Sequence, residues 1–298
     1  AVIVATGASE YQPKEFLYGQ NPRVMTQLEL AERLQKGEAG DAAKVVMIQC
    51  VGSRNEDNPN CSRICCQSAI KNALQIKKVN PEADIFILYR DIRTYGLLED
   101  YYAEARRQGI LFFPFDPEDP PVVESSEDGV QVSFKDQMLD RPLTVKADIL
   151  ALSAGMVPED TEELSSILKL ARNPEGFFME AHIKLRPVDM ATEGIFVCGT
   201  AHSPKLLSET ISQAYASAAR ATTFLSQTEL TLSAVTARVE AEKCASCLVC
   251  VRSCPYNVPK INEEGVSEID AATCHGCGIC AAECPAKAIQ LSWYEDEQ

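Results

Sequence analysis

CASCLVCVRSCP (residues 244–255) and CHGCGICAAECP (residues 274–285) decide the fold of the C-terminal part of the chain. They are two copies of one motif, in which three closely spaced cysteines precede a fourth that is followed by proline. In this arrangement three thiolates hold one face of an iron–sulfur cubane, and the fourth thiolate reaches across to the other cubane. The repeat therefore predicts two [4Fe–4S] sites with crossed ligation.

Crossed ligation assigns four cysteines to each cluster. The first set is Cys244, Cys247, Cys250 and Cys284, and the second is Cys274, Cys277, Cys280 and Cys254. A pair of zinc sites is disfavoured, because zinc modules use two CxxC pairs per metal. Gly276 and Gly278 favour the iron–sulfur interpretation, since glycine lets backbone amides approach cluster sulfurs. The segment resembles bacterial two-cluster ferredoxins, and we expect a small α+β domain over residues 231–298.

Cysteine content, net charge and the length of apolar runs limit the kind of protein that this chain can be. Thirteen cysteines, clustered and odd in number, in a chain without a secretion signal indicate metal binding in a reducing, cytoplasmic compartment. A net charge of −15 argues against nucleic acid as a partner. The apolar runs are far shorter than the roughly 20 residues of a membrane span, so we expect no membrane insertion.

The first 225 residues contain three short apolar strands that each end in a glycine turn. They lie at Ala1–Ala8, Asp148–Pro158 and Gly194–Ala201. Such turns resemble the two-dinucleotide-binding-domain flavoproteins of the thioredoxin reductase type. The resemblance implies a Rossmann-like α/β fold and a partial FAD-binding domain over residues 1–230.

Residues 40–150 have the pattern of the nicotinamide-binding half of such proteins. Apolar spacing predicts strands at 44–49, 83–89 and 109–115, helices at 67–79 and 97–108, and a hairpin at 129–134 and 143–145. No G-x-G-x-x-G sequence follows the first strand or occurs elsewhere. We therefore expect this half to be degenerate and to have lost nicotinamide binding.

Four cysteines stand where that glycine loop is missing. Cys50, Cys61, Cys65 and Cys66 lie within 17 residues, in a loop that leads into a helix. Their spacing is compatible with a further [4Fe–4S] cluster, with zinc, or with ordinary or redox-active cysteines. The spacing by itself does not choose among these.

The strings QCVGSR…CSRICC…AIK and EAHIKLRPVDMATEGIFVCGTAHSPK, together with the tandem tail, resemble the A subunit of heterodisulfide reductase and its homologues in anaerobic bacteria. The resemblance covers essentially the whole chain. It implies that Cys50, Cys61, Cys65 and Cys66 hold a third, non-canonical [4Fe–4S] cluster, and that FAD is bound and can bifurcate electron pairs. It also implies partners: B- and C-type subunits, hydrogenase- or dehydrogenase-linked electron donors, and ferredoxin.

The chain also departs from that family. Full-length members carry an N-terminal domain and the G-x-G-x-x-G loop for the FAD adenosine ahead of the equivalent of Ala1, often with an inserted ferredoxin. We expect either a fragment of a longer subunit or a separate polypeptide that supplies the missing half.

The resemblance implies flavin contacts in this half. Thr6 and Gly7 would touch the ribityl or pyrophosphate, Gly155 would mark the crossing between domains, and Gly199 and Thr200 would precede a helix at 207–225 whose N-terminus faces the flavin. Lys205 would add positive charge near the ring. The alternatives are simple tight turns and, for Lys205, a solvated surface lysine.

Other features are expected to be structural. Cys198 fits a buried structural cysteine, and His182, His202 and His275 form no ligand triad. Residues 226–241 form the expected domain boundary with an extended connector, and the acidic stretch 116–128 is expected to be a mobile surface loop.

These features together predict an electron-transfer subunit of an oxidoreductase, with chemistry on the terminal substrate performed by other chains and no catalytic residue here. One alternative is a non-catalytic, ferredoxin-bearing scaffold. The other is an NADPH oxidoreductase similar to the glutamate synthase small subunit, which the missing G-x-G-x-x-G and the CSRICC string both disfavour.

Overall fold

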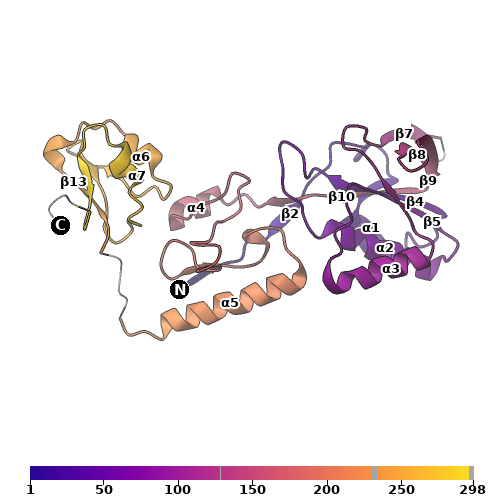
Figure 1. The fold of residues 1–298 in the computed structure, drawn as a ribbon, viewed down its shortest axis with the longest axis horizontal. Coiled ribbons are helices and arrows are strands. Elements are labelled where there is room, and N and C mark those ends of the chain that lie inside the picture. The colour runs from indigo at the N-terminus through magenta and orange to yellow at the C-terminus, as the bar shows by residue number, and fades with distance from the viewer. Residues whose placement is uncertain (128, 230–233, 295–298) are drawn as a thin grey trace. The chain divides into compact units, whose positions relative to one another are not determined.

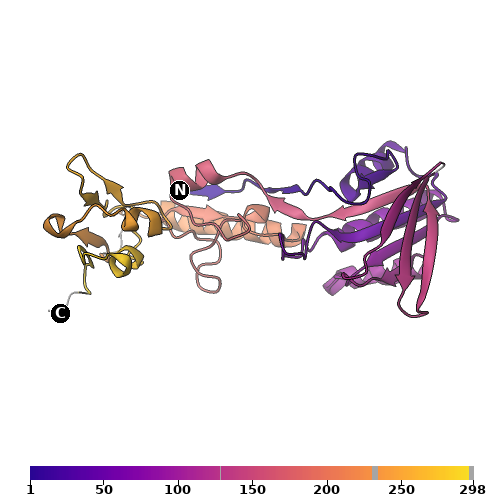
Figure 2. The ribbon, with the colours of Figure 1, turned by 90° about the horizontal axis from the view of Figure 1, so that it is seen from above.

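The structure, a computed structural model, describes residues 1–127, 129–229 and 234–294. The chain divides into two compact units (Figures 1 and 2). One comprises Ser9–Val157 and Pro204–Leu206, and the other comprises Ala1–Ala8, Pro158–Ser203 and Leu207–Gln298.

A five-stranded parallel sheet forms the centre of the Ser9–Val157 unit. Its order is β3 (Val24–Thr26), β10 (Ile149–Ala154), β4 (Lys44–Val51), β5 (Asp84–Tyr89) and β6 (Leu111–Pro114). Helices α1 (Gln27–Lys36), α2 (Cys65–Val79) and α3 (Glu99–Arg107), with the short η1 (Gly96–Leu98), connect these strands. This is the doubly covered parallel arrangement that the alternating strands and helices predict.

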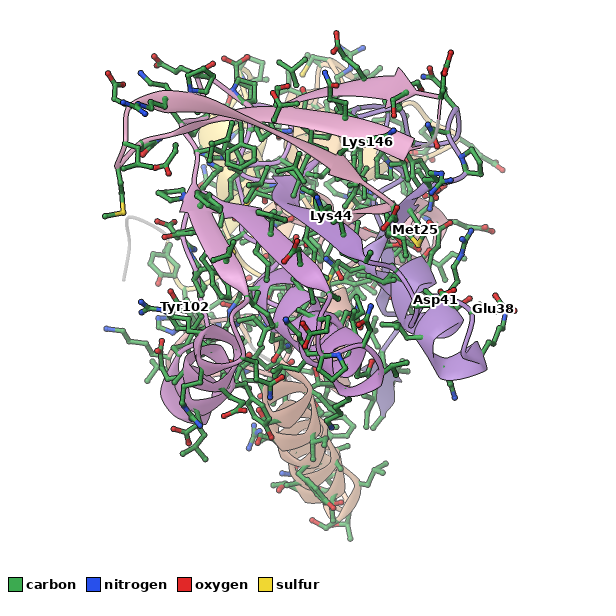
Figure 3. All side chains as sticks on the ribbon, turned by 90° about the vertical axis from the view of Figure 1, so that its right-hand side faces the viewer. Met25, Glu38, Asp41, Lys44, Tyr102 and Lys146 are labelled. Carbon is green, nitrogen blue, oxygen red and sulfur yellow. The ribbon has the colours of Figure 1, made fainter. Side chains whose placement is uncertain are left out.

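The two faces of this sheet carry different layers. Val45 and Met47 belong to the core formed with α1, α2 and α3, whereas Val46 and Ile48 belong to the core shared with a second, antiparallel sheet. That sheet consists of β7 (Val122–Ser126), β8 (Gly129–Asp136) and β9 (Arg141–Ala147). Figure 3 shows helices beneath the parallel sheet and the antiparallel strands above it. Because successive side chains in a strand point to opposite faces, a continuous apolar run fits a sheet that is buried on both sides.

Most elements expected from the sequence of this unit are present, but one expectation is wrong. The sequence predicts a surface loop over 116–128, whereas Val122–Ser126 forms β7 and pairs with β8 from Val122↔Ser133 to Ser126↔Gly129. Acidic and proline residues do not favour a strand, but backbone pairing with β8 stabilises one here. Residue 128 of that stretch lies outside the described residues.

The other unit holds the first and last of the strand–glycine turns. Strand β1 (Val2–Val4) pairs in parallel with β12 (Ile195–Val197), which is followed by η2 (Gly199–Ala201) and α5 (Leu207–Leu225). Helix α4 (Glu162–Leu168) packs on their core, whose buried members are Val4, Leu170, Phe178, Met190, Ile195, Val197 and Ala201. The chain passes between the units through the paired strands β2 (Ala8–Glu10) and β11 (Met156–Pro158).

The C-terminal module is built on the repeat. Strands β13 (Ala237–Val239) and β16 (Ile289–Leu291) pair antiparallel, as do β14 (Lys260–Ile261) and β15 (Ser267–Glu268). The short helices α6 (Val249–Ser253) and α7 (Ile279–Glu283) occupy equivalent places in the two copies, and η3 (Ala241–Lys243) precedes the first copy. The boundary expected at residues 230 and 231 lies outside the described residues.

In the described parts of the chain, the helices are all too short or too polar to cross a bilayer.

Helix α1 was not expected, although its start carries a recognisable signal. The Thr26 hydroxyl accepts a hydrogen bond from the Glu29 amide at 3.3 Å, and the Glu29 carboxylate accepts one from the Thr26 amide at 2.7 Å. The Thr26 hydroxyl also donates to Glu10 at 2.8 Å. This reciprocal pair is a capping box, which the string T-Q-L-E encodes.

We predict that Thr26→Ala lowers the free energy of unfolding by about 1 kcal/mol, because the Glu29 amide at the start of α1 loses its hydroxyl acceptor and Glu10 loses a hydrogen-bond donor. Anaerobic thermal unfolding of the metal-loaded protein measures the change. Thr223→Ala, on the exposed side of α5, is the control and should change stability by less than about 0.5 kcal/mol. Equal effects of the two substitutions would contradict a stabilising cap.

Candidate metal centres

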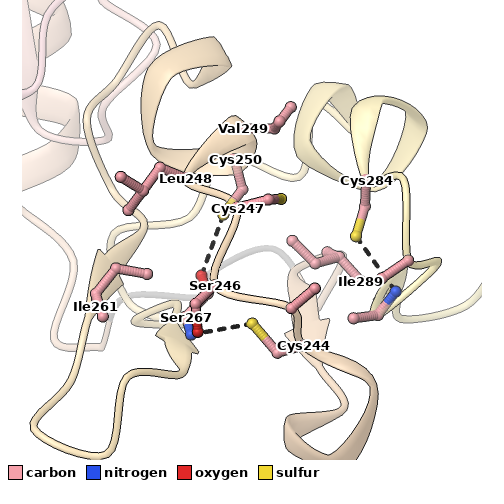
Figure 4. Close-up of a pocket in the computed structure, with 13 residues that line it drawn as sticks. Cys244, Ser246, Cys247, Leu248, Val249, Cys250, Ile261, Ser267, Cys284 and Ile289 are labelled. Carbon is pink, nitrogen blue, oxygen red and sulfur yellow. Dashed lines mark hydrogen bonds between the residues drawn. The ribbon is translucent and has the colours of Figure 1, made fainter.

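One cavity in the C-terminal module is lined by Cys244, Cys247, Cys250 and Cys284. The first three come from the loop before α6 and from its first turn, and Cys284 follows α7. Figure 4 shows the four side chains around one space. About 340 Å³ there is filled by no protein atom, and part of it is open to solvent. Residues 40 positions apart in the sequence thus share one site.

A second cavity lies beside the other copy of the motif. Cys254, Cys274, Cys277 and Cys280 line it, with about 290 Å³ of unfilled space. The rings of Tyr256 and His275 form part of its wall, with their centroids 3.9 Å apart. The two cavities divide the eight cysteines as crossed ligation requires.

Backbone amides point at the sulfur atoms in this module. The amide of Ser267 donates to Cys244 Sγ at 3.5 Å, that of Ala237 to Cys274 Sγ at 3.3 Å, and that of Ala288 to Cys284 Sγ at 3.3 Å. The amides of Ser267 and Ser246 lower the pKa of the Cys244 thiol. Such donors stabilise thiolates, which are the metal-binding form of cysteine.

Burial raises the thiol pKa of another candidate ligand, Cys280, instead of lowering it. It raises the pKa of Cys280 to about 11, and neighbouring cysteines add to the effect. A thiolate at this position therefore needs a compensating cation, which a metal core supplies.

The repeat also constrains the backbone. Ser246 and its counterpart Gly276 have φ of 52° and 63°, and Leu248 and its counterpart Gly278 have φ of 63° and 79°. At Gly276 a Cβ atom would lie 2.5 Å from the Val235 carbonyl oxygen, so close packing gives this glycine a reason beyond amide access to a cluster.

Among residues 1–127, 129–229 and 234–294, no three His, Cys, Asp or Glu side chains are grouped to hold a single metal ion. Tetrahedral zinc sets its sulfur ligands about 3.8 Å apart, from a Zn–S bond of about 2.3 Å. A cubane is larger and offers each cysteine its own iron atom.

A third group of cysteines lies in the other unit, where β4 leads into α2. Cys50 is near the end of β4, Cys61 is in the connecting loop, and Cys65 and Cys66 are the first two residues of α2. The pKa of Cys65 is raised well above its usual value. The largest cause is its hydrogen bond with Cys66, followed by burial and by the charges of Cys66, Cys50 and Cys61. The four cysteines therefore lie in one neighbourhood, at the junction of β4 and α2.

The remaining thiols of this group have distinct surroundings. The hydrogen bond from Cys65 is the main cause that lowers the pKa of Cys66 to about 7. Burial raises the pKa of Cys50, although Arg54 partly opposes this. The amide of Arg63 donates to Cys61 Sγ at 3.3 Å. The start of α2 also favours negative charge, because helix N-termini carry unpaired N–H groups.

Gly155 is placed against this cysteine loop. A Cβ atom there would lie 2.8 Å from the Gly52 carbonyl oxygen and 3.0 Å from the Ser53 Cβ atom, and the Gly155 amide donates to Val51 at 2.7 Å. Gly52 in turn has φ of 65° and lies against the ring of Tyr11. Within this unit, Gly155 therefore supports the loop that carries Cys50.

The flavin-type residues form two sets. Thr6 and Gly7 follow β1, and Gly199 and Thr200 follow β12. Because β1 and β12 are parallel neighbours, both loops leave the same edge of the sheet, which is where such folds bind dinucleotides. Gly155 and Lys205 belong to the other unit.

A hydrogen-bonded chain fixes the turn at Gly199. The Gly199 amide donates to Gln213 Oε1 at 2.9 Å, Gln213 Nε2 lies 2.9 Å from His202 Nδ1, and His202 Nε2 lies 2.7 Å from Glu180. The sequence did not reveal this role of His202, since its partners lie 11 and 22 residues away.

Lys205 and Cys198 are both buried. Lys205 is 7% exposed, so the alternative of a solvated surface lysine is wrong. Its neighbour Pro204 accepts a hydrogen bond from Arg63 at 3.2 Å, which ties this segment to the cysteine loop. Cys198 is buried, as expected of a structural cysteine.

Known proteins resemble this chain in both parts. Residues 236–285 match the family model described as a 4Fe-4S dicluster domain. A thioredoxin reductase of Lactococcus lactis has a similar fold, with a TM-score of 0.50 and 16% identity over 76% of this chain and 66% of that chain. The C-terminal module is thus a 4Fe-4S dicluster domain, and the preceding part has the fold of thioredoxin reductase-type flavoproteins.

Curated relatives cover nearly the whole chain. The A subunit of the H(2)/formate:CoB-CoM heterodisulfide,ferredoxin reductase of Methanococcus maripaludis is 39% identical over 100% of this chain and 48% of its own length. The A subunit of the ferredoxin:CoB-CoM heterodisulfide reductase of Methanosarcina acetivorans is 36% identical over 91% of this chain and 39% of its own length. Nearly the whole chain is therefore similar to heterodisulfide reductase A subunits, and it spans less than half the length of these two relatives.

Proposed function

We propose that this chain relays electrons between FAD and partner subunits of a heterodisulfide reductase-type oxidoreductase, through three [4Fe–4S] clusters. The observation that carries the proposal is the division of eight cysteines between two cavities, four to each, by residues from both copies of the repeat. A pair of neighbouring cubanes serves one-electron transfer.

The donor set fits iron–sulfur clusters. Cys244, Cys247, Cys250 and Cys284 would hold one cluster, and Cys254, Cys274, Cys277 and Cys280 the other. The amides of Ser267, Ala237 and Ala288 already donate to cysteine sulfurs at three of these positions. Hydrogen bonds to the sulfurs are one of the means by which proteins set cluster potentials.

Cys50, Cys61, Cys65 and Cys66 would hold the third cluster. They gather where β4 leads into α2, and two of them open that helix. The loop that bears them replaces the tight glycine turn between the first strand and helix of a nicotinamide-binding half. This replacement supports an internal electron site in place of a nicotinamide site.

A flavin would be held only in part by this chain. Thr6, Gly7, Gly199 and Thr200 leave the same sheet edge and would contact its ribityl or pyrophosphate region, with Gly155 and Lys205 as further candidates. FAD would supply the exchange between electron pairs and single electrons. The chain's own residues would position it, since Gln213 fixes the Gly199 amide.

Substrate and partners follow from the names of the relatives. Those names give CoB-CoM heterodisulfide and ferredoxin as what the relatives act on. We propose that ferredoxin exchanges electrons with this chain, and that B- and C-type subunits perform the disulfide chemistry in the cytoplasm. Bifurcation of an electron pair at the flavin is part of this proposal.

Metal analysis of anaerobically purified full-length protein tests the proposal. We expect about twelve iron atoms per copy of this chain, beyond those of any additional clusters in the remainder of the full-length polypeptide, together with EPR signals of reduced cubanes. About eight iron atoms would remove the third cluster. Zinc in place of iron would overturn the electron relay.

Crossed ligation predicts a specific pattern of iron loss. Cys244→Ser and Cys284→Ser should each remove about four iron atoms, and the double variant should remove no more, because both cysteines serve one cluster. Cys244→Ser combined with Cys254→Ser should remove about eight. Iron and sulfide quantitation distinguishes the two double variants, and the reverse order would show that each motif holds its own cluster.

Gly155→Ala should disrupt the third site selectively. Its methyl group would meet the Gly52 carbonyl and displace the loop that carries Cys50, so iron should fall from about twelve to about eight atoms. Gly109→Ala is a control for backbone strain alone, because φ is 78° there but no atom lies within 4 Å of the added Cβ, so iron content should stay at about twelve atoms. Full iron content in Gly155→Ala would contradict this dependence.

A further inference from the structure

The loop that carries Cys50 and Cys61 has an unusual backbone. Cys50, Arg54 and Arg63 have φ of 63°, 57° and 62°, in the left-handed region that non-glycine residues rarely occupy. Such a conformation is strained and persists only where the surroundings enforce it. Strain of this kind, gathered in one loop, indicates that the positions of these side chains matter.

The backbone of Arg54 is held from two sides. Its amide donates to the Asn60 carbonyl at 3.2 Å, and its carbonyl accepts from Arg90 Nη1 at 2.7 Å. These contacts fix the direction in which the Arg54 side chain leaves the loop.

The Arg54 guanidinium lies between a carboxylate and a candidate ligand sulfur. Its Nη2 lies 2.7 Å from Asp91 Oδ2, and its Nη1 lies 3.9 Å from Cys50 Sγ. Asp91 lies beside the cysteine group, since its carbonyl oxygen is 3.7 Å from Cys66 Sγ. Arg93 lies 3.3 Å from the same carboxylate oxygen. The Arg54 side chain is 20% exposed, so water screens it only partly.

A permanent cation at this distance acts on electron affinity. A [4Fe–4S] core with four thiolates has a net charge of −2, and the gain of one electron from a flavin hydroquinone or an external reductant makes it −3. A guanidinium keeps its charge at all working pH values and is attracted more strongly to the −3 state than to the −2 state. It therefore favours reduction.

We propose that Arg54, oriented by Asp91, raises the reduction potential of the cluster at Cys50, Cys61, Cys65 and Cys66. This inference rests on the proposed third cluster. The hydrogen bonds to sulfur described above for the ferredoxin module come from backbone amides, which carry partial charges, whereas Cys50 faces a full charge. This full charge distinguishes the surroundings of Cys50 from those of Cys244, Cys274 and Cys284.

EPR-monitored redox titration of the anaerobic full-length protein, with dithionite as reductant, tests the proposal. Arg54→Gln should shift one cubane component to lower potential and leave the others unchanged, so these serve as internal references. Arg54→Lys, which keeps the charge but not the bidentate geometry, should give a smaller shift. Arg107→Gln, which removes a charge from the exposed end of α3, should give none.

Asp91→Asn tests the positioning role. If Asp91 orients Arg54, the shift caused by Arg54→Gln should be smaller in the Asp91→Asn background than in the wild type, since coupled residues are non-additive. Equal shifts in the two backgrounds would overturn the role of Asp91.

Iron content separates the possible failures. If the wild type lacks the third cluster, the proposed function fails before the variants are compared. If the third cluster is present and Arg54→Gln leaves every potential unchanged, only the inference about Arg54 is overturned. If Arg54→Gln loses iron, we expect Arg54→Lys to keep about twelve iron atoms. Loss of iron in Arg54→Lys as well would show that Arg54 is needed for cluster assembly and does not set the reduction potential.

Discussion

Four thiolates that share one site repel one another, and the backbone has to hold them together against that repulsion. In the C-terminal module the repeat achieves this by bringing Cys284 from α7 to the three cysteines beside α6. Amides then stabilise the negative charge, as at Cys244 and Cys274. The short strands and helices of the module are arranged around this requirement, and so is the burial of Cys250 and Cys280 in its core.

The same constraint explains why a nucleotide-binding architecture can carry cysteines. A strand followed by a helix N-terminus favours anions, whether they are phosphates or thiolates. Here β4 and α2 keep that geometry, but the tight glycine turn is replaced by a longer loop with Cys50 and Cys61. Gly155 and Gly52 provide the close backbone approach that this loop needs. The fold is retained while the chemistry of the strand end changes.

Sequence was informative where chemistry follows local spacing. The motif spacing predicted how eight cysteines divide, and apolar periodicity predicted β4, α2, β5 and α3. It failed for β7, because that strand depends on pairing with β8 more than on its own composition. The contact of Arg54 with Asp91 spans 37 positions, and that of Gly155 with Gly52 spans 103. Such contacts leave no local pattern, so only the folded chain reveals them.

The ferredoxin-type sites and the site at Cys50 differ in the charge that faces their cysteine sulfur atoms, and this difference bears on where an electron would go. Amide dipoles stabilise a reduced cluster by partial charges, whereas the Arg54 guanidinium contributes a full charge that is only partly exposed. Since Asp91 is half exposed, its opposing charge is screened more than that of Arg54. Arg54 is therefore a local positive charge beside Cys50, in a chain whose overall charge is −15. If the proposed third cluster forms, a cation at this strand end would favour its reduced state within an otherwise acidic protein.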